Sequence, residues 1–358
     1  MEYLVVASSY GAAAVSLMYM AIRIREHHAL NNLPTAGEAS RLSLGRLFTL
    51  AMHAERARSR QKRRAISRAF SLRRLHILAY VWVAFRIVRT VRVIPTRAYR
   101  GLTLLLCLSS LLRVVDDIVD EHAAPLKGTR EDLFKHITQL IACLDEPDSL
   151  DGPIRPEEVL FFFIVNGCKA LGIDAVDLLQ RAWEEYEPYA SCLMKKLIVL
   201  DQRTLDRATR ANVLLYVLGG RMIGLSELLA WRHAKLSTAS NLECDNMRDL
   251  LRDIKARQFT ISIEVFETVS FTPEDLLSAE SWDDLAAIPG LPELCAAQAK
   301  KGGEDWSRHM PLLEREVLPH VKPWPVRKVL CTAWRKRTEL YERYSAYWGS
   351  KVTTAASG

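Results

Sequence analysis

The sequence predicts an all-α protein with a hydrophobic and basic N-terminal extension. Apolar residues recur at intervals of three and four along most of the chain after Pro95. We find no run of strands with period-two alternation and no glycine-rich phosphate loop. The 358 residues are 49% hydrophobic, which is enough apolar material for a sizeable core. A disordered chain or a disulfide-stapled mini-protein is therefore excluded.

Charge is divided unevenly along the chain. Residues 1–100 carry 18 Lys and Arg against 4 Asp and Glu, a net charge of +14. The remaining 258 residues carry 31 basic against 38 acidic side chains, a net charge of −7. The total of +7 therefore describes neither part.

The first segment, Tyr3 to Ile22, is uncharged and is followed by Arg23 and Arg25. Twenty uncharged residues can just span a bilayer, but the interspersed serines make this a weak spanning segment. It also lacks the basic start and cleavage site of a signal peptide. Three interpretations remain open: a helix packed on the domain, a membrane anchor, or an interfacial helix.

The next segment is strongly basic. Arg41 to Arg74 hold eleven Lys and Arg and a single acid, Glu55. Few aromatic rings accompany these charges, which disfavours nucleic-acid binding. A solvated basic helix, or a helix lying on anionic lipid, is the better interpretation. We therefore expect residues 1–94 to form an extension that can contact a membrane surface.

We expect the second part of the chain, residues 95–350, to be one helical domain, with a disordered tail at 351–358. Breaks are expected at Pro125, at Glu146–Pro156, at the Gly219-Gly220 pair and at Pro289–Pro292. The helical periodicity covers seven segments: Leu102–Val119, Leu133–Leu144, Val159–Leu171, Val176–Leu200, Ala211–Trp231, Leu242–Ile254 and Val326–Trp348.

The seven cysteines are dispersed and show no paired spacing. This pattern predicts reduced core residues, an intracellular, reducing location and no structural zinc site. They are Cys107, Cys143, Cys168, Cys192, Cys244, Cys295 and Cys331.

A cluster of carboxylates ends the first apolar helix of the predicted domain. Asp116, Asp117 and Asp120 follow the apolar run Leu102–Leu112, and Asp116 and Asp120 share a helical face. Such carboxylates repel one another and resist desolvation, which costs several kcal/mol without compensation. A divalent cation such as Mg²⁺ compensates for this and can bridge to a substrate diphosphate. The alternative is a helix end that emerges into solvent.

A second acidic pattern lies about 130 residues further on. Asp245, Asp249 and Asp253 step by four and so lie along one helix face. Arg248 and Arg252 step by the same interval on an adjacent face, so a surface helix with internal ion pairs is the simpler interpretation of this segment alone. Two acidic helix faces together favour a multi-metal diphosphate site.

These motifs resemble those of the squalene/phytoene synthase family of class I isoprenoid synthases. Arg113 to Glu121 resembles the first aspartate-rich motif of that family, and Leu250 to Ile254 resembles the core of the second. Tyr216 to Gly224 is similar to the glycine-containing helix between them. The order and spacing match over roughly residues 97–350. Two departures are Ala256-Arg257, where the family has an acidic pair, and Ser109 or Ser110 in place of an aromatic residue.

A second resemblance is to class I terpene cyclases. The four-residue stepping of Asp245, Asp249 and Asp253 is similar to the metal-binding triad of those enzymes, although they usually have Asn and Ser or Thr at two of the positions. Arg343-Tyr344 resembles the Arg-Tyr pair that closes over their diphosphate. Both families imply the same helical fold and the same first step, ionisation of an allylic diphosphate.

The resemblances imply a set of site residues and a cofactor. Two or three Mg²⁺ ions would be held by Asp116, Asp117 and Asp120 on one helix and by Asp245, Asp249 and Asp253 on the other. The candidates for binding diphosphate are Arg113, Arg221, Arg252, Arg343 and Tyr344. A dry cavity must then shield the carbocation, and aromatic rings could line it. Core packing is the simpler role for each candidate ring. The candidates are Phe161, Phe162, Phe163, Trp183, Tyr186, Tyr189 and Trp231.

Three functions follow as expectations. The first is a prenyltransferase that joins two farnesyl or geranylgeranyl diphosphates head to head. The second is a terpene cyclase that uses one such substrate. The third is a catalytically inactive relative that acts as a membrane-associated scaffold, which Arg257 and the basic N-terminus motivate. No dinucleotide fingerprint indicates whether a reductant is used.

Overall fold

The computed structural model describes Met20 and residues 23–65, 96–119, 125, 128–195, 199–255, 262–321 and 324–356. Within these ranges the chain is almost entirely helical and contains no strand, with only two isolated bridges. The all-α prediction is therefore confirmed. By internal contacts the chain divides into two compact units: residues 1–77 with 123–166, and residues 78–122 with 167–358.

Unit 1 combines the start of the chain with a later segment. Its elements are a helix over residues 23–31, α2 (Ala36–Arg41), α3 (Leu44–Ala65), α6 (Arg130–Ala142), the short turns η1 (Pro147–Ser149) and η2 (Pro156–Glu158), and most of α7 (Val159–Lys169).

Specific contacts join the two segments of unit 1. The Ile154 N–H donates to the Pro34 carbonyl at 2.9 Å, and the Asn166 amide donates to the Ser40 carbonyl at 3.0 Å. The Phe48 and Phe163 rings are 5.7 Å apart. Residues 34–48 thus belong to a folded unit, where the sequence predicted an extension separate from a domain at 95–350.

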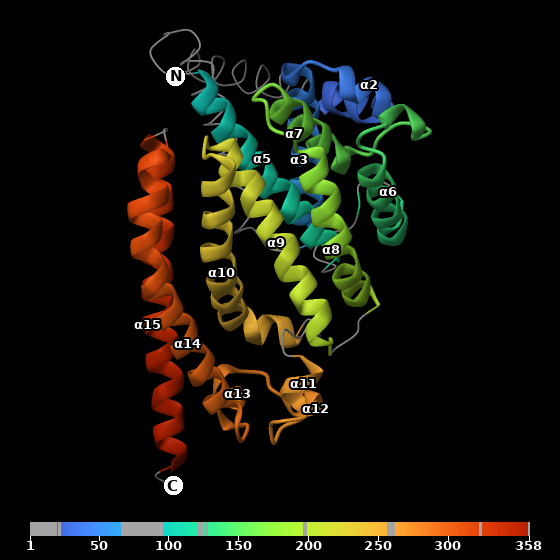
Figure 1. Ribbon diagram of the computed structural model, residues 1–358. Helices are drawn as coiled ribbons and strands as arrows, with labels where there is room; N and C mark the ends of the chain where they lie inside the picture. Colours follow the sequence, from blue (N-terminus) through green and yellow to red (C-terminus); the bar gives the residue numbers. More distant parts are fainter. Residues whose placement is uncertain are drawn as a thin grey trace, which may run out of the picture. The chain divides into compact units, whose positions relative to one another are not determined.

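Unit 2 is built around a group of long helices (Figure 1). They are α5 (Thr96–Val119), α8 (Val176–Met194), α9 (Gln202–Met222), α10 (Glu227–Lys255), α14 (Leu291–Leu312) and α15 (Trp324–Ala356). The shorter elements are α11 (Ile263–Phe266), α12 (Pro273–Leu277), α13 (Trp282–Ala287), the π-turn η3 (Leu313–Val317) and η4 (Leu318–His320). α9 packs against α5, α8 and α10, and α14 packs against α10 and α15.

Local sequence signals begin several of these helices. Thr35, Thr129, Thr272 and Ser281 each form a capping box with the acid three residues later, and Asp201 accepts from the Thr204 N–H. Each cap satisfies an otherwise unpaired backbone N–H of the first turn. The same hydrogen bonds hold the pKa of Asp132, Asp201, Asp275 and Asp284 below the usual value.

The glycines of α9 do not break the helix, contrary to the sequence prediction. α9 continues through Gly219 and Gly220 and ends at Met222, and the turn is made at Gly224, whose φ is +92°. A Cβ at Gly219 would lie 3.0 Å from Leu105 Cδ1, and a Cβ at Gly220 would lie 3.0 Å from Ala230 Cβ. The two glycines therefore let α5 and α10 approach α9 closely.

The C-terminal region also differs from the prediction. α14 was not among the predicted helices, and its buried residues include Cys295, Ala299 and Gly302, whose small side chains give a weak hydrophobic pattern. α15 runs to Ala356, so residues 351–356 are helical where a disordered tail was expected.

The other predictions have mixed outcomes. No helix among the described residues is long and apolar enough to cross a membrane. Apart from Met20, the Tyr3–Ile22 segment lies outside the described residues. Six cysteines are described as free thiols, and Cys107, Cys168 and Cys295 are buried. Burial raises the pKa of these three thiols to about 12, so none is a thiolate nucleophile at neutral pH.

The contact between α5 and α9 leads to a test of the fold. A Cβ at Gly101 would lie 1.9 Å from the Met222 carbonyl oxygen, a backbone atom that cannot move aside. We expect Gly101→Ala to lower the free energy of unfolding by about 2 kcal/mol or more, since forcing atoms into a filled contact shifts the backbone. Urea denaturation followed by circular dichroism measures the change.

Gly349→Ala is the matched control. Gly349 lies in α15, and a Cβ there would meet no atom within 4 Å. Alanine should therefore raise the free energy of unfolding by about 0.5–1 kcal/mol, the helix propensity difference. Equal effects of the two substitutions would contradict the close approach of α5 to α9.

Candidate functional site

The directions of α5 and α10 decide where the two acidic segments lie. Gly101, near the start of α5, is next to Met222 at the end of α9, whereas Leu105, one turn later in α5, is next to Gly219, one turn earlier in α9. α5 is therefore antiparallel to α9. α10 is also antiparallel to α9, because only residues 223–226 connect them and Ala230 returns against Gly220. α5 and α10 thus run in the same direction (Figure 1).

The helical rise gives the level of each acidic segment along α9. Asp116 lies eleven residues beyond Leu105, which is about 16 Å along the helix. Asp245 lies fifteen residues beyond Ala230, about 22 Å along in the same direction. Asp116 and Asp245 are therefore within about one turn of each other in level, beside the first half of α9. Asp249 and Asp253 lie further along α10 in the same direction.

The end of α5 has an apolar environment. Val114, Val115, Ile118 and Val119 are all buried, with exposed fractions of 7% or less. Asp116 is half-buried among them. This is not the setting of a helix end that emerges into solvent. Asp117 lies on the same turn, and Asp120 falls outside the described residues.

The last turns of α10 pack into a core cluster of unit 2. Leu250 and Ile254 are buried in a cluster with Phe271, Leu276 and Trp348, and Asp253 is half-buried. The backbone positions of Asp245, Asp249 and Arg252 are described, but not their side chains; the same holds for Arg113 in α5. Among the side chains that are described, no group of three or more His, Cys, Asp or Glu could hold a metal ion.

α15 carries Arg343 and Tyr344 to the level of the acidic segment of α10. The Trp334 ring is 6.4 Å from the His233 ring, and the Arg337 guanidinium donates to the Ser237 carbonyl at 3.3 Å. Further along, Trp348 packs in the cluster that holds Leu250. α15 therefore runs in the same direction as α10, and Tyr344 comes level with about Asp245. Tyr344 packs against both core clusters of unit 2, whereas Arg343 is exposed.

Arg221 is separated from the other candidates. It lies in the last turn of α9, next to the start of α5. Its position is roughly 20 Å along α9 from the level of Asp116. The structure therefore does not bring Arg221 together with the aspartates, although the sequence analysis grouped them.

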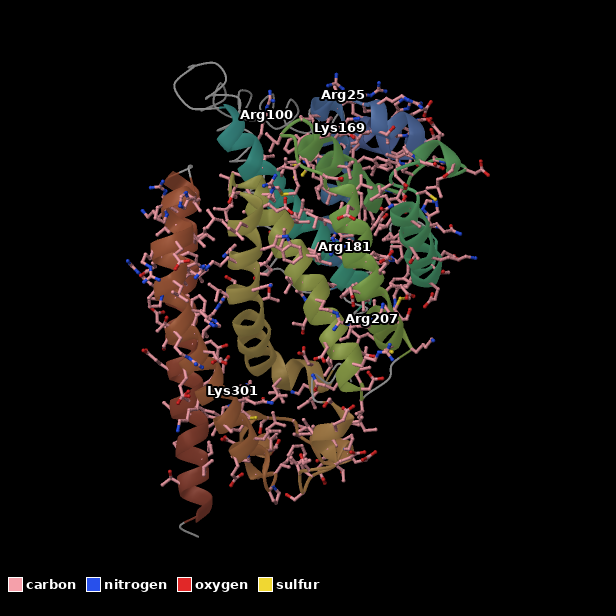
Figure 2. The ribbon with its side chains drawn as sticks, in the orientation of Figure 1. Arg25, Arg100, Lys169, Arg181, Arg207 and Lys301 are labelled. Carbon is pink, nitrogen blue, oxygen red and sulfur yellow. The ribbon has the colours of Figure 1, made fainter. Side chains whose placement is uncertain are left out.

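Two cations of α9 near the level of Asp116 have partners on α8. Arg207 and Arg210 of α9 lie 3.3 Å and 3.1 Å from the Glu185 carboxylate of α8, and Arg207 also donates to the Glu184 carbonyl (Figure 2). These contacts hold α8 and α9 together. Arg113 and Arg252 are carried by the acidic segments themselves and remain the predicted candidates for binding diphosphate.

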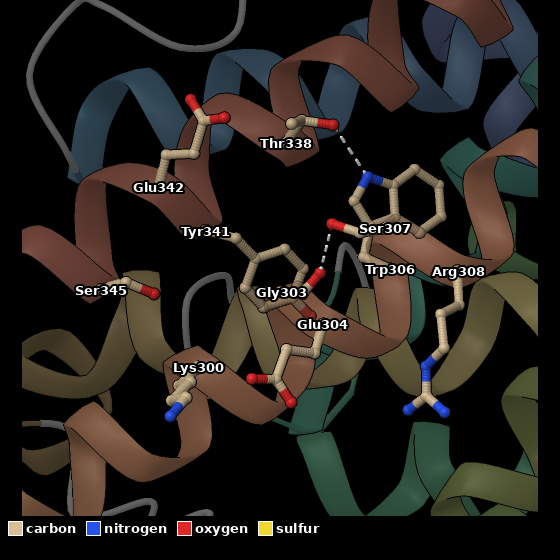
Figure 3. Close-up of a pocket in the computed structure, with 10 residues that line it drawn as sticks. All are labelled: Lys300, Gly303, Glu304, Trp306, Ser307, Arg308, Thr338, Tyr341, Glu342 and Ser345. Atoms are coloured by element: carbon tan, nitrogen blue, oxygen red, sulfur yellow. Dashed lines mark hydrogen bonds between the residues drawn. The ribbon is translucent and has the colours of Figure 1, made fainter.

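The aromatic residues considered for a cavity have packing roles in the described structure. Phe161, Phe162 and Phe163 are buried in unit 1. In unit 2, the Tyr186 ring lies 6.0 Å from Trp183 and 5.7 Å from Tyr189. The described structure shows a hollow of about 580 Å³ elsewhere, between α14 and α15, with Glu304, Tyr341 and Glu342 in its lining (Figure 3). None of the predicted site residues lines this hollow.

Unit 2 contains a buried polar cluster whose residues were not among the predicted site residues. The His233 ring nitrogen Nδ1 is 3.1 Å from the Ser237 hydroxyl, and Arg337 lies 4.4 Å above the Trp306 ring. Trp306 Nε1–H donates to the Thr338 hydroxyl at 3.0 Å. The signal in the sequence is the pair His233 and Ser237, four residues apart. Burial, aided by the Arg337 charge, lowers the pKa of His233 to about 4.

Comparisons of the chain with protein-family models, curated proteins and solved structures find no match. The structure thus has two acidic segments and an Arg-Tyr pair at a similar level along the long helices of unit 2.

The buried His233 predicts a dependence of stability on pH. Its pKa is about 4 in the folded protein and about 6.5 in an unfolded chain. Below pH 6.5 the unfolded state therefore binds the extra proton, so stability falls as the pH drops from 6.5 towards 4. We expect this residue to contribute a loss of about 2 kcal/mol between pH 7 and pH 5, measured by urea denaturation at both values.

Two variants isolate this contribution. His233→Gln should flatten the pH dependence between pH 7 and pH 5, whereas His320→Gln, at an exposed histidine, should leave it unchanged. An unaltered pH dependence in His233→Gln would show that another group causes it.

Proposed function

We propose that this protein is a Mg²⁺-dependent class I terpenoid synthase that ionises an allylic prenyl diphosphate, farnesyl or geranylgeranyl diphosphate. The observation that carries the proposal is the common direction of α5 and α10, which pack on the same helix, α9, with Asp116 and Asp245 at a similar level along it. Two acidic segments at a similar level beside one helix support a shared diphosphate site. The most similar chemistry, judged from the motifs, is that of squalene and phytoene synthases.

The donor chemistry fits a magnesium site. Carboxylate oxygens are the ligands that Mg²⁺ selects, and Asp116, Asp117 and Asp120 would hold one group of ions while Asp245, Asp249 and Asp253 hold the other. Asp116 is half-buried, and its neighbours in α5, Val114, Val115, Ile118 and Val119, are buried. Bound Mg²⁺ supplies positive charge that stabilises the departing diphosphate.

The protein's own side chains bind and orient the substrate in this proposal. Arg113 lies one turn before Asp116 in α5, and Arg252 is next to Asp253 in α10. Each guanidinium can donate hydrogen bonds to diphosphate oxygens as charge develops on them. Arg221 is left out of this role because it lies at the other end of α9.

The contacts of α15 favour a second candidate, a terpene cyclase. Tyr344 lies on the packed side of α15 at about the level of Asp245. A tyrosine and an arginine there can cover a diphosphate held by α10, which suits the cyclisation of a single substrate. A third candidate is an inactive, membrane-associated scaffold; it rests on the basic N-terminus and on Arg257, which lies outside the described residues.

Incubation of the purified full chain with Mg²⁺ and either farnesyl or geranylgeranyl diphosphate tests the proposal. We expect release of inorganic diphosphate, measured by a coupled phosphate assay, and its loss on addition of a chelator. Asp116→Asn should lower the rate at least about 100-fold, because removing charge stabilisation of this kind costs roughly 3 kcal/mol or more in the barrier.

Asp151→Asn is the matched control, because Asp151 is an exposed aspartate in unit 1. It should leave the rate unchanged. A product with twice the carbons of the substrate identifies head-to-head condensation, and a cyclic product of unchanged size identifies the cyclase. Absence of diphosphate release with both substrates, or full activity of Asp116→Asn, would contradict the proposal.

A further inference from the structure

The helix over residues 23–31 in unit 1 has an unusual distribution of side chains. Its one acid, Glu26, is 3% exposed, whereas Ile24 is 63% exposed and Met20, four residues earlier, is 57% exposed. A helix on a water-soluble surface normally shows the reverse arrangement, with apolar residues inward and charges outward. Glu26 lies 3.8 Å from Arg23. The outward apolar residues therefore need an explanation.

The other outward residues of this helix are polar and include a cation, Arg25. Arg25, His27 and His28 are all exposed and surround Ile24 (Figure 2 labels Arg25). The outward side thus combines two apolar side chains with basic groups and has no acid among its exposed residues. This is the composition of a helix that lies at a lipid interface.

A second helix of unit 1 has the same electrostatic character. Leu47, Leu50, Ala51 and Ala54 form the buried side of α3. Arg46 is exposed, and at helical spacing positions 56, 60 and 63, all arginine, fall on the side of the α3 backbone opposite the buried residues, whereas Arg58 is buried. Clustered basic residues favour an anionic membrane by about 1 kcal/mol for each residue near its surface.

We propose that the outward side formed by Met20 and residues 23–31 binds an anionic phospholipid bilayer, with Met20 and Ile24 entering the interface and Arg25 among the headgroups. Two apolar side chains are too few for a stable protein interface, which needs roughly 1,000 Å² or more. Nucleic acid is disfavoured because the surface offers no Phe, Tyr or Trp for stacking.

Vesicle flotation of the full chain tests this inference. Vesicles of phosphatidylcholine with a third phosphatidylserine should carry the wild-type protein upward at low salt, and pure phosphatidylcholine vesicles should carry at least about tenfold less. Ile24→Asp should lower the bound fraction at least about tenfold, because it removes apolar contact and adds a like charge to the anionic surface.

Leu228→Asp is the matched control. Leu228 is 79% exposed in the first turn of α10 in unit 2, so the same chemical change is made at a site outside the proposed surface. It should float like the wild type, and circular dichroism should show both variants folded. Unchanged flotation of Ile24→Asp, an equal loss in Leu228→Asp, or binding to single-stranded RNA in place of anionic vesicles would overturn the proposal.

Discussion

The close approach of α5 and α10 to α9 is the constraint on which the rest of unit 2 depends. Three glycines make it possible: Gly101 lies against the Met222 backbone, Gly219 against Leu105, and Gly220 against Ala230. Any larger side chain at these positions would push the helices apart, and interiors packed at crystal-like density have no room for that. α9 therefore fixes the position and direction of both neighbours.

The direction of these helices is what gives the acidic segments a common position. Because α5 and α10 are both antiparallel to α9, Asp116 and Asp245 lie at a similar level along α9, although they are about 130 residues apart in the sequence. α15 follows α10 in the same direction, held by Arg337 and Trp334 at one end and Trp348 at the other. Tyr344 is carried to the level of Asp245 as a consequence.

Periodicity predicted most helices because large apolar residues mark their buried sides, as in α5, α6 and α7. It missed α14, whose buried stripe is made partly of Cys295, Ala299 and Gly302. It also placed a break at Gly219-Gly220, because the sequence does not show whether a glycine ends a helix or lets another helix approach. The αL conformation of Gly224 marks the real turn.

The candidate site was only partly predictable for a related reason. The spacing of Asp245, Asp249 and Asp253 defines a helix face, but the sequence does not say which end of a neighbouring helix that face meets. Arg221 was grouped with the aspartates by its place in a motif, and the antiparallel course of α9 carries it to the opposite end. The His233 cluster was missed because its members come from α10, α14 and α15, far apart in the chain.

The central claim is that α5 and α10 together form one metal–diphosphate site. Anomalous X-ray diffraction from crystals of the full chain soaked with Mn²⁺ and inorganic diphosphate tests it most directly. The account predicts Mn²⁺ peaks about 2.2 Å from carboxylate oxygens of both Asp116 and at least one of Asp245, Asp249 and Asp253, with diphosphate between the two helices. Peaks that contact only one of the two helices, or diphosphate bound at another place in unit 2, would contradict it.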